Sequence, residues 1–106
     1  MDSELLTQMN ERIVKSFLDM LILKELKLGS LNDSQLVNIF HKRFGEIVDF
    51  TLINSNLKLL EKEELITNRK DGNRKVYTLT VRGDKKAIDF LNSKNKILGL
   101  LLNLFI

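Results

Sequence analysis

The sequence contains no cysteine, no proline and only one histidine, His41. Without cysteine, neither a disulfide framework nor thiolate chemistry is available. A single histidine cannot build a zinc site by itself. Since proline is absent and no repeat or low-complexity tract divides the chain, nothing indicates an internal linker. We therefore expect one domain, residues 1–106, with no metal and no cofactor.

Long apolar runs and targeting signals are also missing. No apolar stretch reaches the length needed to cross a bilayer, and the first residues lack the basic and then apolar order of a secretory signal. Together with the absence of cysteine, these features favour a soluble, cytoplasmic protein with no membrane partner.

Patterns typical of enzymes are absent as well. The sequence has neither a nucleophile elbow nor a glycine-rich phosphate loop. His41 has no cysteine or carboxylate partner in the pattern and is interpreted as a surface or boundary residue. Glu61, Glu63 and Glu64 crowd one exposed helix without an apolar cleft, so we interpret them as solvated surface. Catalysis is not expected.

Composition and charge point to a globular protein with a polyanionic partner. The chain has 106 residues, of which 43% are hydrophobic and 29% charged, which suits one domain with a modest core. Residues 1–50 hold six basic and eight acidic residues, a net charge of −2, whereas residues 51–106 hold eleven and six, a net charge of +5. This asymmetry favours a polyanion near the second half.

Apolar residues recur at helical spacing in three successive segments. The first covers residues 12–28 and the third about 49–64, while the second begins after an N-cap at Asn32 or Asp33 and is closed by Gly45. The residues expected to face the core are Ile13, Val14, Phe17, Leu18, Leu21, Ile22 and Leu26, then Leu36, Val37, Phe40 and Phe44, then Ile53, Leu57 and Leu60.

A basic β-hairpin is predicted over residues 65–80, LITNRKDGNRKVYTLT. The dipeptide Asp71-Gly72 suits a tight type I′ turn. A turn centred there pairs Arg69 with Arg74, two like charges whose repulsion an approaching anion would relieve. The alternative is an ordinary solvated turn.

The order helix, helix, helix, hairpin, helix is that of a winged helix-turn-helix, in which the third helix enters the major groove and the hairpin lies against the DNA backbone. We therefore predict a mainly α fold with a small β-hairpin. The winged helix-turn-helix core of the domain covers residues 12–83, and an extended C-terminal dimerisation helix covers residues 84–106.

Two groups of polar residues are candidates for contact with double-stranded DNA. The outer face of the third helix offers small, polar and basic side chains to base edges, and the hairpin offers cations to phosphates or the minor groove. These residues are Thr51, Asn54, Ser55 and Lys58 on the helix, and Arg69, Lys70, Asn73, Arg74 and Lys75 on the hairpin. The alternative is a plain solvated surface.

The C-terminal tail is too apolar for a lone domain of this size. Thr80 can cap a last helix that continues into it, with apolar residues near a/d spacing. These predicted dimer-interface residues are Ile88, Leu91, Leu98, Leu101, Leu102 and Phe105. The first helix, with Leu6, Met9, Met20 and Leu23 off its main stripe, could supply the other half of the interface. The alternatives are an intramolecular cap and a membrane-surface segment, which the lack of a basic face disfavours.

The segments LKLLEKEELI, residues 57–66, and RKVYTLTVRG, residues 74–83, resemble the end of the recognition helix, the wing and the start of the last helix in PadR-type transcriptional regulators. The resemblance implies a small winged-helix protein that binds operator DNA as a homodimer and usually represses. It allows a small-molecule effector, but no residue pattern here identifies one. Asn54-Ser55 replaces the Tyr-Pro frequent in that family, and Glu64 stands where a glycine usually ends the recognition helix.

We therefore expect a homodimeric, sequence-specific DNA-binding transcriptional regulator, a repressor by resemblance, with half-sites about 34 Å apart. The alternative is a winged-helix protein–protein interaction module that uses the apolar tail and first helix. Oligomeric state and affinity for random duplex DNA distinguish the two.

Overall fold

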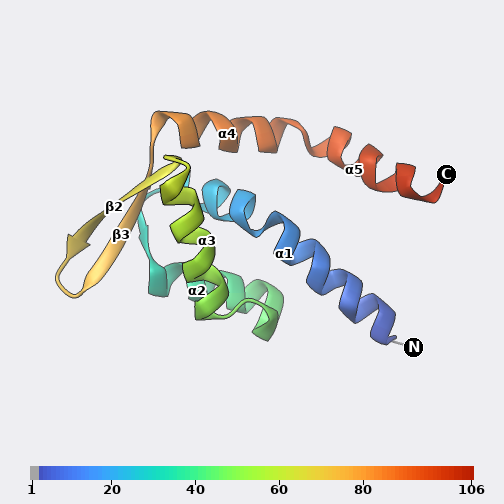
Figure 1. Ribbon diagram of the computed structural model, residues 1–106, viewed down its shortest axis with the longest axis horizontal. Helices are drawn as coiled ribbons and strands as arrows, with labels where there is room; N and C mark the ends of the chain where they lie inside the picture. Colours follow the sequence, from blue (N-terminus) through green and yellow to red (C-terminus); the bar gives the residue numbers. More distant parts are fainter. Residues whose placement is uncertain (1–2) are drawn as a thin grey trace.

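A computed structural model describes residues 3–106 as a helical body from which a β-hairpin projects (Figure 1). The elements are α1 (Glu4–Leu26), β1 (Leu31–Asn32), α2 (Asp33–Phe44), the 3-10 turn η1 (Gly45–Ile47), α3 (Phe50–Lys62), β2 (Ile66–Asp71), β3 (Arg74–Leu79), α4 (Val81–Asn92), α5 (Lys94–Leu102) and the 3-10 turn η2 (Asn103–Phe105). None of these helices combines the length and apolar character needed to span a bilayer. The mainly α architecture with a small hairpin is confirmed.

Side chains cap the starts of four helices. At the start of α2, the side chain of Asn32 accepts a hydrogen bond from the backbone N–H of Gln35, and the side chain of Gln35 accepts one from the backbone N–H of Asn32. The two bonds form a reciprocal capping box. Asp49 and Thr80 cap α3 and α4 through the N–H groups of Leu52 and Gly83. The predicted caps at Asn32 and Thr80 are confirmed. The first helix starts at Glu4, well before the predicted residue 12, because Ser3 caps it there.

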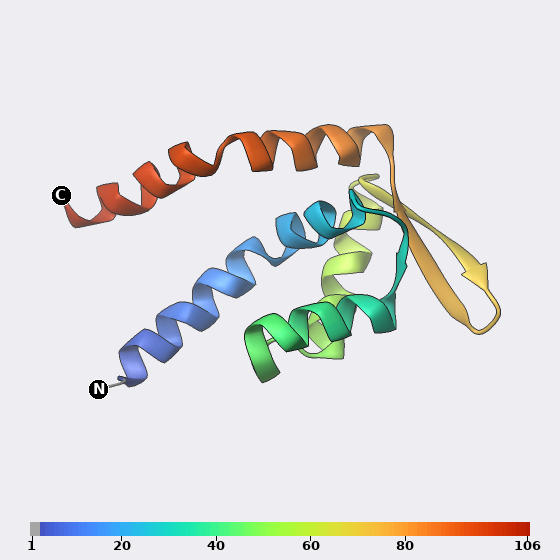
Figure 2. The same cartoon turned by 180° about the vertical axis from the view of Figure 1, so that it is seen from behind.

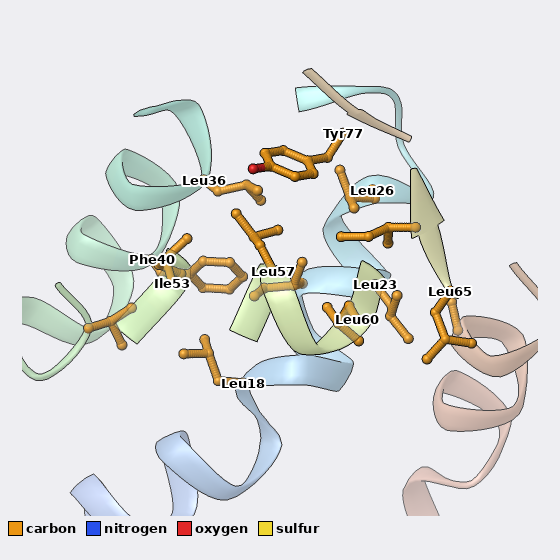
Figure 3. Packing of buried hydrophobic residues seen from close by; sticks show 14 of the residues in the cluster. Leu18, Leu23, Leu26, Leu36, Phe40, Ile53, Leu57, Leu60, Leu65 and Tyr77 are labelled. Atoms are coloured by element: carbon orange, nitrogen blue, oxygen red, sulfur yellow. The ribbon is translucent and has the colours of Figure 1, made fainter. Parts of the chain in front are cut away.

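The core lies where α1, α2 and α3 meet, and Tyr77 of β3 covers one end (Figure 3). The predicted inward stripes of α2 and α3 are confirmed, since Leu36, Phe40, Ile53 and Leu57 are all fully buried. On α1 the prediction holds less well, since Ile13, expected to face the core, is 44% exposed. Leu23, expected off the main stripe, is fully buried, and Met20 packs against the core, because helices cover α1 on more than one side.

The hairpin register differs from the predicted one. The loop is Gly72-Asn73, and Asp71 faces Arg74, so Arg69 lies opposite Val76 and not opposite Arg74. Gly72 has φ +64° whereas Asn73 does not have positive φ, which is the pattern of a type II′ turn and not of type I′. The observed register places an acid opposite Arg74, which avoids the expected repulsion between facing arginines.

A third, very short strand was not predicted. β1 pairs antiparallel with β3, with Leu31 opposite Tyr77 and Asn32 opposite Val76. The hydroxyls of Ser30 and Thr78 hydrogen bond at 2.7 Å beside it. Because Asn32 is also the N-cap of α2, the base of the hairpin is joined directly to the start of that helix.

The C-terminal region is two helices and not the predicted continuous one. α4 ends at Asn92, and at Ser93 the backbone (φ −99°, ψ 9°) leaves the helical region before α5 begins. α4 packs on α1, where the rings of Phe17 and Phe90 lie 6.2 Å apart. Among the described residues, α5 packs mainly against α4 and η2.

Both views place the hairpin at the end of the molecule opposite the start of α1 and the end of α5 (Figures 1 and 2). The exposed apolar residues are concentrated at the latter end. They include Leu5, Leu6, Met9, Leu98, Leu102 and Phe105. The molecule thus has a basic, polar end and an apolar end.

Candidate nucleic-acid interface

The outer face of α3 is polar and accessible. Thr51, Ser55 and Lys58 are exposed and Asn54 is half-buried. Their spacing places them on adjoining turns of the helix, opposite the buried stripe. The hydroxyl of Ser55 donates to the carbonyl oxygen of Leu52 at 3.0 Å, so in this conformation it offers an incoming base an acceptor.

The hairpin carries all five predicted contact residues at its exposed tip. They are Arg69, Lys70, Asn73, Arg74 and Lys75. Lys70 and Lys75 face each other directly, so their like charges share one face of the sheet. Arg69 and Arg74 lie on the other face as diagonal neighbours, which remain within electrostatic reach.

The two hairpin faces have different surroundings. Alternation along the strands places Lys70 and Lys75 on the face that also carries Asn68 and Tyr77. Asn68 donates a hydrogen bond from its side-chain amide to Glu61 of α3, and Tyr77 is buried in the core. The lysine pair therefore continues the face of the hairpin that meets α3. On the other face, Arg74 lies a long 3.9 Å from Asp33 in an exposed pair that contributes little.

Glu61 is a partner within the fold and not the free surface acid that we expected. It is half-buried and accepts from Asn68, which ties the C-terminal half of α3 to β2. Burial raises the pKa of Tyr77 above 10.0, and the carboxylates of Glu61 and Asp33 raise it further. At neutral pH the phenol is uncharged and fills the space beneath the hairpin.

Residues 60–65 form the corner between α3 and β2. Glu64 adopts φ +62°, the left-handed conformation for which a glycine is usual. The N–H of Leu65 donates to the carbonyl oxygen of Leu60 at 3.0 Å, which closes a Schellman-type end of α3. Having Glu64 in place of the glycine usual in PadR-type regulators therefore does not prevent the corner from forming, but the backbone of Glu64 is strained.

Comparison with solved structures identifies this arrangement. Bacillus subtilis PadR, solved in complex with operator DNA, matches with a TM-score of 0.63 and 30% identity over 70% of this chain and 46% of PadR. The chain is a winged helix-turn-helix protein. A transcriptional regulator from Clostridium thermocellum (TM-score 0.68, 19% identity, 89% and 91% of the two chains) and the putative regulator TA0346 from Thermoplasma acidophilum (0.65, 24%, 88% and 95%) share the fold. The predicted fold class is confirmed.

Other comparisons give no further assignment. No protein-family model matches the chain, and no curated protein matches it. The chain spans about half the length (46%) of PadR. Among residues 3–106, no group of three or more histidine, aspartate or glutamate side chains could hold a metal ion.

The wing comprises residues 66–79. The apolar residues predicted to form a dimer interface lie on α4, α5 and η2, which lead away from the wing (Figure 1). Ile88, Leu91 and Leu98 are 38%, 43% and 50% exposed, Leu102 and Phe105 are more exposed still, and Leu101 is half-buried. Leu91 and Leu98 line a groove of about 480 Å³ that also contacts Ile13, Phe17 and Phe44. In the described part of the chain, this surface is left without a partner.

Two exposed apolar residues of α3 were not predicted from the sequence. Phe50 is 53% exposed and Leu59 59% exposed, and neither belongs to the residues that pack against the core. The exposure of Leu59 can be read from the spacing, because this residue lies off the Ile53/Leu57/Leu60 stripe. Phe50 lies three residues before Ile53 and seven before Leu57, so the spacing alone places it in line with the buried stripe.

Proposed function

We propose that this protein is a homodimeric, sequence-specific regulator of transcription that binds double-stranded DNA and represses. The observation that carries the proposal is the exposed polar face of α3 beside the wing's cations, joined through the Asn68–Glu61 hydrogen bond. Such a surface suits duplex DNA because its cations neutralise phosphate charge while its polar side chains contact base edges. The similarity to PadR, solved with operator DNA, supports the same function.

In this proposal, α3 enters the major groove. Thr51, Asn54, Ser55 and Lys58 address base edges, with Asn54 suited to adenine and Lys58 to guanine or a phosphate. The wing residues Arg69, Lys70, Asn73, Arg74 and Lys75 contact phosphates or the minor groove. Because the arginines and the lysines lie on different faces of the hairpin, the wing tip can insert between two phosphate strands and offer a cation pair to each.

The exposed apolar surface supports association of two copies. Ile88, Leu91, Leu98, Leu101, Leu102 and Phe105 on α4, α5 and η2 would be buried against the second protomer, together with Leu6 and Met9 of α1. Leaving apolar area in water costs about 25 cal/mol per Å². We expect the Leu98→Asp, Leu102→Asp double variant to sediment as a monomer and the wild type as a dimer. A wild-type monomer would contradict this part of the proposal.

Salt dependence of DNA affinity tests the wing. Each phosphate contact contributes about 0.9 to the slope of log K against log salt concentration. Removing Arg69 and Arg74 by alanine should lower the magnitude of that slope by about 2 if one wing engages the duplex, and by about 4 if both wings of a dimer do. Fluorescence anisotropy across a salt series measures it.

The matched control is the Lys85→Ala, Lys86→Ala double variant. It removes the same charge from exposed residues of α4, which leads away from the wing. Its slope should stay that of the wild type. A wing variant with an unchanged slope would reject the wing's role, and a wild type without affinity for any duplex at low salt would reject DNA binding altogether.

A second candidate function is a winged-helix module that binds another protein through its apolar end. The exposed Leu98, Leu102 and Phe105 favour it. A wild-type monomer without DNA affinity at low salt would select this candidate over the regulator.

A further inference from the structure

We infer that the first two turns of α3 read A·T base pairs, with Phe50 contacting thymine methyl groups beside an adenine paired by Asn54. This inference rests on the proposed function and specifies the DNA that the same surface takes. It depends on the Phe50 patch, which we define as Phe50, Thr51 and Asn54.

The Phe50 patch is a mixed apolar and amide surface at the start of the recognition helix. Phe50 and Asn54 are i, i+4 neighbours, and Thr51 and Asn54 are i, i+3 neighbours, so the three side chains adjoin one another. Phe50 is 53% exposed and Thr51 is exposed, while Asn54 is half-buried. Among the described residues no side-chain hydrogen bond involves Asn54, and its polar atoms are not buried, so its amide can pair with a base.

The chemistry of this patch matches A·T and not G·C pairs. In the major groove, thymine displays a C5-methyl group that accepts apolar contact from phenylalanine or from the threonine methyl, and adenine displays the N6 and N7 edge that asparagine pairs. Residues 50–57, FTLINSNL, contain no charged residue, so this part of α3 offers neither the arginine nor the lysine that usually pairs with guanine. Lys58 comes directly after this segment, one turn beyond Asn54.

The position of Phe50 supports contact rather than packing. It lies at the first residue of the helix, directly after the N-cap Asp49, and outside the set of hydrophobic residues that pack on the core. Helical side chains lean toward the N-terminus, so the ring covers surface beyond the start of the helix. That is the end of a recognition helix that approaches base edges.

The test compares wild-type binding to two random duplex pools of equal length at one salt concentration. The central positions of one pool are restricted to A·T pairs and those of the other to G·C pairs. We expect tighter binding to the A·T pool. Equal binding to both pools would overturn the inference and leave the proposed function intact, whereas no binding to either pool at low salt would overturn the proposed function.

Uracil substitution separates methyl contact from DNA shape. A·T-rich duplexes also have a narrow minor groove that attracts the wing's arginines, and this preference does not depend on the thymine methyl. In the best duplex from the A·T pool, each thymine is therefore replaced in turn by uracil, which removes only the methyl group. We expect about fourfold weaker binding at each contacted position. Unchanged affinity at every position would overturn the methyl contact.

Variants assign the contact to Phe50. Phe50→Ala should bind the thymine and uracil duplexes equally, whereas Leu59→Ala, which removes the other exposed apolar side chain of α3, should keep the difference. Circular dichroism melts establish that both variants fold. A Phe50→Ala protein that still distinguishes thymine from uracil would overturn the assignment, and the wild-type uracil series remains decisive if this variant does not fold.

Discussion

Replacing Gly83 by alanine should sharply destabilise the protein, although the same change in an open helix is favourable. Gly83 lies in the first turn of α4, against the corner between α3 and β2. A Cβ atom there would lie 1.9 Å from the carbonyl oxygen of Leu65 and 2.9 Å from its carbonyl carbon. Both are backbone atoms, so no side chain can move to make room.

The loss of stability can be worked out from the hydrogen bonds that are disturbed when Leu65 moves away from the added Cβ atom. Moving Leu65 away from α4 stretches the hydrogen bond from Thr80 N–H to its carbonyl oxygen (3.1 Å) and the bond from the Thr80 hydroxyl to Glu64 (2.8 Å). Each is worth about 1 kcal/mol, and overpacking strain adds about 1 to 3 kcal/mol. The better helix propensity of alanine offsets about 1 kcal/mol. We expect a net loss of about 2 to 4 kcal/mol in the free energy of unfolding.

Thermal and urea unfolding at one protein concentration measure this loss. The expected fall in Tm is about 10 to 30 °C. Gly99→Ala is the matched control, because Gly99 is also helical but an added Cβ meets open space. It should raise the stability by up to about 1 kcal/mol. A Gly83→Ala variant as stable as Gly99→Ala would refute the close approach of α4 to the corner.

Two further predictions concern the corner and the tyrosine beneath the wing. Glu64→Gly should stabilise the protein by about 1 kcal/mol in urea unfolding, because glycine tolerates φ +62°. The control Glu63→Gly, at φ −80°, should destabilise the protein. A lower free energy of unfolding for Glu64→Gly would contradict backbone strain at Glu64. Since folding raises the pKa of Tyr77, its contribution to stability is complete below pH 10 and is lost as the pH rises further. Tyr77→Phe should therefore lose less stability than the wild type between pH 9 and 11, and identical profiles would contradict this.

Much of the helical core was predictable because its periodicity is local. Leu36 and Phe40 on α2, and Ile53 and Leu57 on α3, repeat at the spacing that buries one side of a helix. The candidate DNA-contact residues on α3 could be predicted by elimination, since polar residues off the buried stripe face outward. The fold class followed from the order of the elements.

The features that were missed depend on contacts between distant segments or on close alternatives. β1 is two residues long and exists only because Leu31 meets Tyr77, forty-six positions later in the chain. Both Asp71-Gly72 and Gly72-Asn73 suit a tight turn, so composition alone could not select the register. At Ser93 neither proline nor glycine marks the end of α4, and the apolar pattern runs through the break.

The anchoring of the wing has a consequence for how a duplex would be accommodated. The hairpin is tied to α2 through β1 and to α3 through Asn68, so the base of the wing is held beside α3. On the proposed binding mode, the distance between their contact points is set by the protein. Groove width and bending of the nucleic acid must then adapt to that distance, so sequences that deform easily would be favoured even at positions that no side chain touches.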